Sequence, residues 1–173
     1  MDDTTPRPMK VKATRTIGID YGAARIGVSV SDERKIIAKP LMTIKAEKKS
    51  DLTVAKVVAE LSRDEELNNY AIDEIVVGLP LMMSGKVGLQ ADEVKHFVML
   101  LSKVFAVPII TWDERLTTVQ ADRSLREGSM TRKQRSKVVD EVAAVILLQS
   151  YLDSKCARFN RTQDIHDIHD LQD

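Results

Sequence analysis

Short apolar runs and amphipathic stretches alternate along this chain, and their spacing predicts an α/β fold. Two apolar runs, joined by a short Gly/Ala turn that follows Asp20, have the pattern of a β-hairpin. The further elements that the pattern predicts are a strand at about 35–44, a helix at about 51–67, a strand at 75–78, a helix around 94–104 and a strand at 108–112. Three consecutive strands followed by alternating helix and strand predict a five-stranded mixed sheet.

The last predicted helix is apolar on nearly all sides and yet carries an acid, Asp140, within it. On the same face, further along the helix, lie Ala143, Ala144 and Leu147, which are small or apolar. A helix of this kind is largely buried, and an unpaired charge in it is costly. Asp140 therefore requires either a basic partner from elsewhere in the chain or a metal ion.

Two further acids stand at the ends of predicted strands. Asp20 ends the first strand, and Glu114 follows the strand that ends at Trp112. Taken singly, each has an ordinary explanation, because Asp is common in turns and an acid near a helix N-terminus is favourable. Together with Asp140 they supply the carboxylate oxygens that Mg²⁺ and Mn²⁺ prefer. Two such ions about 3.5 to 4 Å apart can activate water and stabilise the leaving oxygen in phosphodiester cleavage.

A basic stretch follows Glu114. Between residues 115 and 137, seven basic residues stand against two acids, and they are Arg115, Arg123, Arg126, Arg132, Lys133, Arg135 and Lys137. The last four lie at the predicted start of the final helix, where each cation opposes the helix dipole by about 0.3 to 1 kcal/mol. A solvated basic face is the ordinary explanation, whereas a phosphate backbone would compensate these charges. We expect these four residues to bind phosphates, with Arg25 and Arg115 closer to the scissile group, although Arg115 could equally pair with a neighbouring acid.

These residues resemble the YqgF family, also called RuvX, over approximately residues 15–155. The resemblance rests on four blocks: Gly18-Ile19-Asp20-Tyr21-Gly22 with Arg25-Ile26-Gly27-Val28; Val76-Val77-Gly78-Leu79-Pro80-Leu81; Asp113-Glu114-Arg115-Leu116-Thr117-Thr118; and Asp140 with Ala143-Ala144, Ile146-Leu147 and Tyr151-Leu152. Members are ribonuclease H-like proteins, related to Holliday-junction resolvases and regarded as nucleases that mature the precursor of 16S ribosomal RNA. The resemblance implies a ribonuclease H-like fold with helices on both faces of the sheet. It also implies a catalytic triad of Asp20, Glu114 and Asp140 that holds Mg²⁺ or Mn²⁺.

The chain departs from the family pattern at two places. After residue 81 the family usually has a polar stretch similar to Asn-Met-Asp-Gly, whereas this chain has Met82-Met83-Ser84-Gly85. In the related resolvases a catalytic acid commonly sits at the end of the fourth strand, where this chain has Gly78. Glu114 would have to replace that acid from the next strand.

Bulk properties agree with one compact domain. The chain has 173 residues, of which 43% are hydrophobic and 30% charged, and its formal net charge is zero. Nucleic-acid binding must therefore come from a local patch. The single cysteine, Cys156, excludes an internal disulfide, and no apolar stretch approaches a membrane span.

We expect a cytoplasmic protein with a flexible leader at 1–14, a nuclease domain at 15–155 and a disordered tail at 156–173. The oligomeric state stays open.

The predicted function is that of a metal-dependent nuclease in 5′-end maturation of pre-16S ribosomal RNA, acting on pre-rRNA or a pre-ribosomal particle. Cleavage of branched DNA, as by a Holliday-junction resolvase, is an alternative, because both substrates contain phosphodiester bonds. A non-catalytic ribosome-assembly or RNA-binding factor is an alternative of another class, since carboxylates do not prove turnover. Actin-like ATPases and sugar kinases share the Asp-x-Gly hairpin, but they need two such domains and this chain has length for one.

Overall fold

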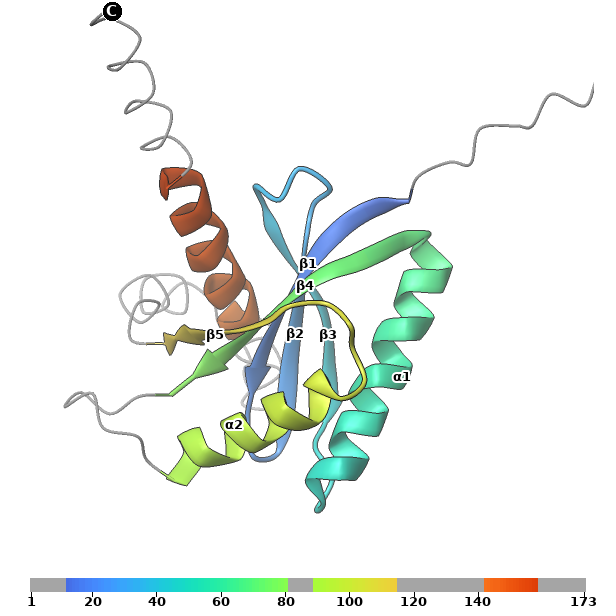
Figure 1. Cartoon of the computed structure of the whole chain (residues 1–173), viewed down its shortest axis with the longest axis vertical. Helices are drawn as coiled ribbons and strands as arrows, with labels where there is room; N and C mark the ends of the chain where they lie inside the picture. The colour runs from blue at the N-terminus through green and yellow to red at the C-terminus, as the bar shows by residue number, and fades with distance from the viewer. Residues whose placement is uncertain (1–11, 81–88, 115–141, 159–173) are drawn as a thin grey trace, which may run out of the picture.

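The computed structural model describes residues 12–80, 89–114 and 142–158 (Figure 1). Along the chain these residues form β1 (Ala13–Tyr21), β2 (Arg25–Ser31), β3 (Ala38–Lys45), α1 (Ser50–Asn68), β4 (Tyr70–Leu79), α2 (Leu89–Ser102) and β5 (Ile109–Asp113). A further helix covers residues 142–158, drawn in orange-red in Figure 1, and is called the 142–158 helix below.

The five strands form one sheet in the order β3-β2-β1-β4-β5. Strands β1, β2 and β3 pair antiparallel, whereas β4 pairs with β1, and β5 with β4, in parallel. Parallel neighbours cannot be joined by a tight turn, and α1 and α2 accordingly precede β4 and β5 in the chain. As a result β1, β4 and β5 all end at the same edge of the sheet, called the carboxyl edge below.

The larger core lies on the face of the sheet that α1 and α2 cover (Figure 1). Alternate strand residues point to this face and pack against apolar residues at helical spacing on the two helices. Members of this core with no exposed surface include Ile17, Ile19, Ile75, Val77, Val57, Leu61, Val94 and Phe97. Burying these side chains ties both crossover helices to one face of the sheet.

The 142–158 helix covers the opposite face. Its Leu148, Tyr151 and Leu152 form a second cluster with Val76, which lies between the inward residues of the first core on β4. Lys155, near the end of the helix, donates hydrogen bonds of 2.9 and 2.8 Å to the carboxylate of Glu74 in the first half of β4. The helix therefore runs antiparallel to β4, and its first described residues lie nearest the carboxyl edge.

The helix approaches β1 closely because residue 18 has no side chain. A Cβ at Gly18 would lie 2.5 Å from Ser29 Oγ and 2.7 Å from Leu148 Cβ. The buried Ser29 hydroxyl also donates a hydrogen bond of 2.8 Å to the carbonyl of Ala144. This contact joins the helix to the hairpin of β1 and β2, and it places Ala144 over β1, the strand that carries Asp20.

The predicted five-stranded mixed sheet with helices on both faces is confirmed, with shifts in the bounds of its elements. Strand β4 begins at Tyr70 rather than at 75, because its first half alternates between buried and partly exposed residues instead of forming an apolar run. Strand β3 begins at Ala38 rather than near 35. Lys35 has φ 56°, and the Asp32 carboxylate accepts hydrogen bonds from the N–H groups of Ile36 and Ile37, so these residues form a turn.

Strand β1 begins at Ala13, and the 142–158 helix continues past Lys155. No helix in the described ranges is both long and apolar enough to cross a membrane.

Replacing Gly18 by Ala tests the close approach of the 142–158 helix. The added methyl would overlap Ser29 Oγ and Leu148 Cβ, so we expect a loss of about 1 to 3 kcal/mol in the free energy of unfolding, measured by urea denaturation. The exposed residue Thr14 on the same strand is the control, and Thr14→Ala should change stability by less than about 0.5 kcal/mol. A Gly18→Ala protein as stable as the unmodified chain would contradict this packing.

Candidate metal centre

Asp20 and Glu114 lie at the carboxyl edge on the two strands that flank β4. Ile19 of β1 is opposite Val77 of β4, and Gly78 of β4 is opposite Trp112 of β5. Asp20 comes two residues after Gly18, and Gly78 comes two residues after Val76, so both stand on the face that the 142–158 helix covers. Neighbouring strands are about 4.8 Å apart, so a side chain from β5 must pass over β4 to approach β1.

Glu114 passes over β4 in the space that the missing side chain of Gly78 leaves. A Cβ at residue 78 would lie 2.5 Å from Glu114 Oε1, 3.2 Å from its Cγ and 3.3 Å from its Cδ. The carboxylate of Glu114 thus occupies the place where the side chain of the fourth strand would begin. The expectation that Glu114 stands in from the next strand for an acid at residue 78 agrees with this geometry.

The electrostatics of Glu114 show that the two acids are neighbours. Burial, followed by the negative charges of Asp20 and Asp113, raises the pKa of Glu114 to about 7. Each cause disfavours the ionised carboxylate, and a nearby cation would favour it. Hard oxygen donors that repel one another in a partly buried place fit a divalent cation such as Mg²⁺ or Mn²⁺.

Arg25 lies at the same edge, on the hairpin turn that follows Asp20. It is exposed, it begins β2, and its carbonyl accepts a hydrogen bond of 3.0 Å from the N–H of Gly22. The tight turn requires a residue without a side chain at position 22, because a Cβ there would lie 2.6 Å from the Arg25 carbonyl oxygen. The turn therefore places a cation beside the carboxyl edge.

The other predicted site residues lie outside the described ranges. They are Asp140 and the basic residues Arg115, Arg132, Lys133, Arg135 and Lys137. Ala144, four residues after Asp140, is described, and it contacts β1 two residues before Asp20, at Gly18. Within the described ranges, no three His, Cys, Asp or Glu residues are arranged to hold a metal ion.

Asp113, whose charge contributes to the raised pKa of Glu114, is not among the predicted site residues. In the sequence Gly78 stands where related resolvases have an acid, and in the structure it provides room for the Glu114 carboxylate. The arrangement could have been inferred from two features of the sequence. A small residue ends one apolar strand, and an acid comes just after the next parallel strand.

Comparison with known proteins gives a consistent result. A family model described as "RuvX: Holliday junction resolvase" matches residues 14–154. A protein of Protochlamydia amoebophila, named "Putative pre-16S rRNA nuclease", is 60% identical over 147 residues, covering 85% of this chain and 98% of the relative. A relative of the same name from Caldanaerobacter subterraneus subsp. tengcongensis is 43% identical over 142 residues, covering 82% and 97%.

Among solved structures, RuvC of T. thermophilus in complex with a Holliday junction substrate is similar, with a TM-score of 0.51. The two chains are 13% identical, and the match covers 82% of this chain and 96% of the other, so the likeness concerns the fold. The predicted ribonuclease H-like fold and the predicted family are both confirmed. On the match over residues 14–154 and the identity to full-length relatives, this chain belongs to the RuvX family.

Proposed function

We propose that this protein is a metal-dependent nuclease that hydrolyses phosphodiester bonds, and that it acts in the cytoplasm in 5′-end maturation of pre-16S ribosomal RNA. The observation that carries the proposal is the placement of the Glu114 carboxylate over Gly78. There the negative charge of Asp20 adds to the effect of burial and raises the pKa of Glu114. A structural role would not require two acids that repel each other at a sheet edge.

Asp20, Glu114 and Asp140 are the proposed ligands of Mg²⁺ or Mn²⁺, with two ions as the expected number. When bound, such ions activate water and stabilise the leaving oxygen of a phosphodiester. Asp20 is held by its pairing with Gly27 of β2, next to the last β1–β4 pair at Ile19, and Glu114 is held against the β4 backbone at Gly78. Asp140 would complete the set from one helical turn before Ala144, which itself contacts β1.

Arg25 is proposed to contact the phosphate next to the scissile bond, since its turn adjoins Asp20. We propose a similar place for Arg115, and phosphate contacts further away for Arg132, Lys133, Arg135 and Lys137. Contacts of this kind attract any nucleic acid and weaken as salt rises, because each neutralised phosphate releases counterions. They provide affinity and leave the choice of substrate to other features.

The choice of pre-16S ribosomal RNA is supported by the names of relatives that share 60% and 43% of their residues with this chain over nearly their whole length. The description of the family model favours a second candidate, cleavage of a four-way DNA junction. The fold is common to both activities. A non-catalytic assembly factor would keep the fold and the acids but would not turn over substrate.

Cleavage assays on two substrates separate these candidates. The purified chain, with Mg²⁺ or Mn²⁺, should shorten a precursor 16S RNA end, offered alone or within ribosomal particles, in preference to a synthetic four-way junction. Asp20→Asn and Glu114→Gln should each lose at least about 100-fold of the activity, because weaker changes around metal ligands already cost about 10- to 100-fold.

Glu66→Gln is the control, because it removes an exposed carboxylate near the end of α1, away from the carboxyl edge, and should retain the activity. Cleavage of the junction but not of the RNA would reverse the order of the two substrates. Cleavage of neither substrate, with either metal, would favour the non-catalytic factor.

Gly78→Ala should impair metal binding far more than folding. The atom in the way of a new Cβ is the end of the flexible Glu114 side chain, so the fold should lose less than about 1 kcal/mol while the carboxylate is displaced. We expect metal affinity, measured by calorimetry, to fall about 10- to 100-fold. In a Glu114→Gln background, Gly78→Ala should lower the metal affinity little further, because the carboxylate that it would displace has already been removed. Equal losses in both backgrounds would argue against this explanation.

The raised pKa of Glu114 predicts a pH-dependent stability in metal-free solution. Its pKa is 4.5 ordinarily and about 7 in the folded chain, so the folded state binds the proton more tightly. The contribution of Glu114 to stability is therefore complete below about pH 4.5 and is lost as the pH rises through about 7.

The measurement is the urea midpoint in EDTA at about pH 5, 6, 7 and 8 for the chain and for Glu114→Gln. The Gln variant should gain stability relative to the unmodified chain as the pH rises, and Mg²⁺ or Mn²⁺ at pH 8 should stabilise the unmodified chain more than the variant. Parallel pH curves for the two proteins would show that Glu114 has no raised pKa.

A further inference from the structure

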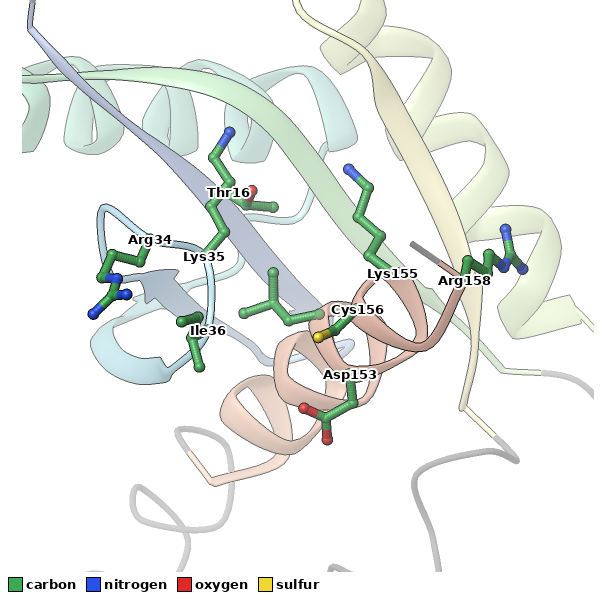
Figure 2. A pocket seen from close by; sticks show the side chains of 9 residues that line it. Thr16, Arg34, Lys35, Ile36, Asp153, Lys155, Cys156 and Arg158 are labelled. Carbon is green, nitrogen blue, oxygen red and sulfur yellow. The ribbon is translucent and has the colours of Figure 1, made fainter. Parts of the chain in front are cut away.

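A cavity of about 610 Å³ lies between the turn that joins β2 to β3 and the second half of the 142–158 helix (Figure 2). Its lining residues are Thr16, Arg34, Lys35, Ile36, Leu152, Asp153, Lys155, Cys156 and Arg158. The volume is within the range of sites that hold small molecules. Thr16 precedes Asp20 by four residues on β1, so the cavity is about 13 Å from the carboxyl edge and on the same face of the sheet.

Most of the lining surface is apolar, and basic residues outnumber acids among its charged side chains. Four Lys or Arg residues and one acid, Asp153, contribute to it. Neighbouring acids on β4 orient two of the cations, since Asp73 pairs with Lys35 and Glu74 accepts two hydrogen bonds from Lys155. Lys35 donates to one oxygen of Asp73, and its ammonium group has three N–H donors. The cavity therefore presents donors and positive charge to an anionic ligand.

One residue of the lining, Thr16, has a buried hydroxyl without a hydrogen-bond partner. In the described part of the chain the other buried side-chain atoms without a partner are Arg15 Nε and Asp73 Oδ1, on residues next to Thr16 in the sheet. The three residues meet where the pairing of β1 with β4 shifts from Arg15–Ile72 to Thr16–Glu74, which leaves Asp73 as the extra residue of a bulge. Bulges re-aim side chains and occur beside functional sites, and an unpaired buried hydroxyl such as that of Thr16 requires an explanation.

Apolar groups complete the lining. Ile36 is 54% exposed on the turn, and Leu152 is buried on the facing helix. In Figure 2, the turn residues Arg34 and Ile36 lie across the cavity from Asp153 and Cys156. A ligand with an anionic group and a less polar, planar body would match both parts of the lining, and guanidinium planes such as that of Arg34 also stack on bases.

We propose that this cavity binds one nucleotide of the substrate strand, with its phosphate against Arg34 and Lys35, a hydrogen bond to the Thr16 hydroxyl, and its sugar or base against Ile36 and Leu152. The identity of the strand rests on the proposed nuclease function, whereas the nucleotide chemistry rests on the cavity alone. A strand anchored here and cut at the carboxyl edge would contact the protein at two points on one face of the sheet.

Cys156 makes occupancy measurable without catalysis. It is the only cysteine of the chain, it is exposed, and it lines the cavity. The rate at which iodoacetamide alkylates Cys156 would be measured in EDTA, in the Asp20→Asn background, with increasing AMP, adenosine or a five-nucleotide single-stranded RNA. The RNA should protect Cys156 saturably and at lower concentration than AMP, and AMP should protect better than adenosine, which lacks the phosphate.

Two variants test the proposed contacts. Arg34→Glu should raise the RNA concentration needed for half-protection by about tenfold or more, and Thr16→Val, which removes the hydroxyl at nearly constant volume, should raise it by about threefold to tenfold. Arg63→Glu is the matched control, because Arg63 is an exposed arginine on α1, on the other face of the sheet. It reverses the same charge and should leave protection nearly unchanged.

Protection by none of the three probes would overturn the proposal, and so would equal effects of Arg34→Glu and Arg63→Glu, which would indicate charge at long range. Protection by AMP but not by RNA would contradict the substrate strand as the ligand and would indicate a free nucleotide instead. Failure of the nuclease function is distinguishable, because it would abolish cleavage and leave the protection of Cys156 intact. If the cavity does not bind the substrate strand, the Arg34→Glu variant should cleave RNA as well as the unmodified chain does.

Discussion

Burial of the Glu114 carboxylate beside Asp20 is the constraint on which the carboxyl edge depends. Water would normally separate two such groups, but here burial and the neighbouring charge together raise the pKa of Glu114 to about 7. The fold tolerates this cost because Ile17 and Ile19 fix β1 in one core while the 142–158 helix covers its other face. A divalent cation bound beside Glu114 would favour its ionised form and would thereby stabilise the folded chain.

The fold and the places of Asp20 and Glu114 at the ends of strands were predictable because their signals are local. Apolar runs and helical spacing are properties of neighbouring residues, and Asp20 directly follows one such run, while Asp113 alone separates Glu114 from another. The role of both acids as metal ligands stays a prediction. The relation between Gly78 and Glu114 was not predictable in the same way. It depends on the register of β4 against β5, and that register is decided by packing between residues far apart in the chain. The places of Asp140 and of the basic residues after Glu114 stay predictions.

The cavity at the other end of β1 had no signal in the sequence for a similar reason. Thr16 looks like an ordinary strand residue, and Asp73 like an ordinary acid before a buried strand. Their unusual environment arises from one shift in the pairing of β1 with β4. The turn that faces them is held by Gln149, whose amide donates to the Ile36 carbonyl and whose oxygen accepts from the Ala38 N–H. Such contacts between a helix and a distant turn are visible only in three dimensions.

The position of β3 at the edge of the sheet also limits how this protein can associate. An edge strand offers unpaired N–H and C=O groups to other strands, and charged residues and proline on it discourage such pairing. Strand β3 has Lys39, Pro40 and Lys45 as exposed residues, and Pro40 has no N–H to donate. Two copies brought together along β3 would also place lysines near lysines. Copies of this chain should therefore not pair through β3, and the sheet should end at this strand rather than continue into a neighbour.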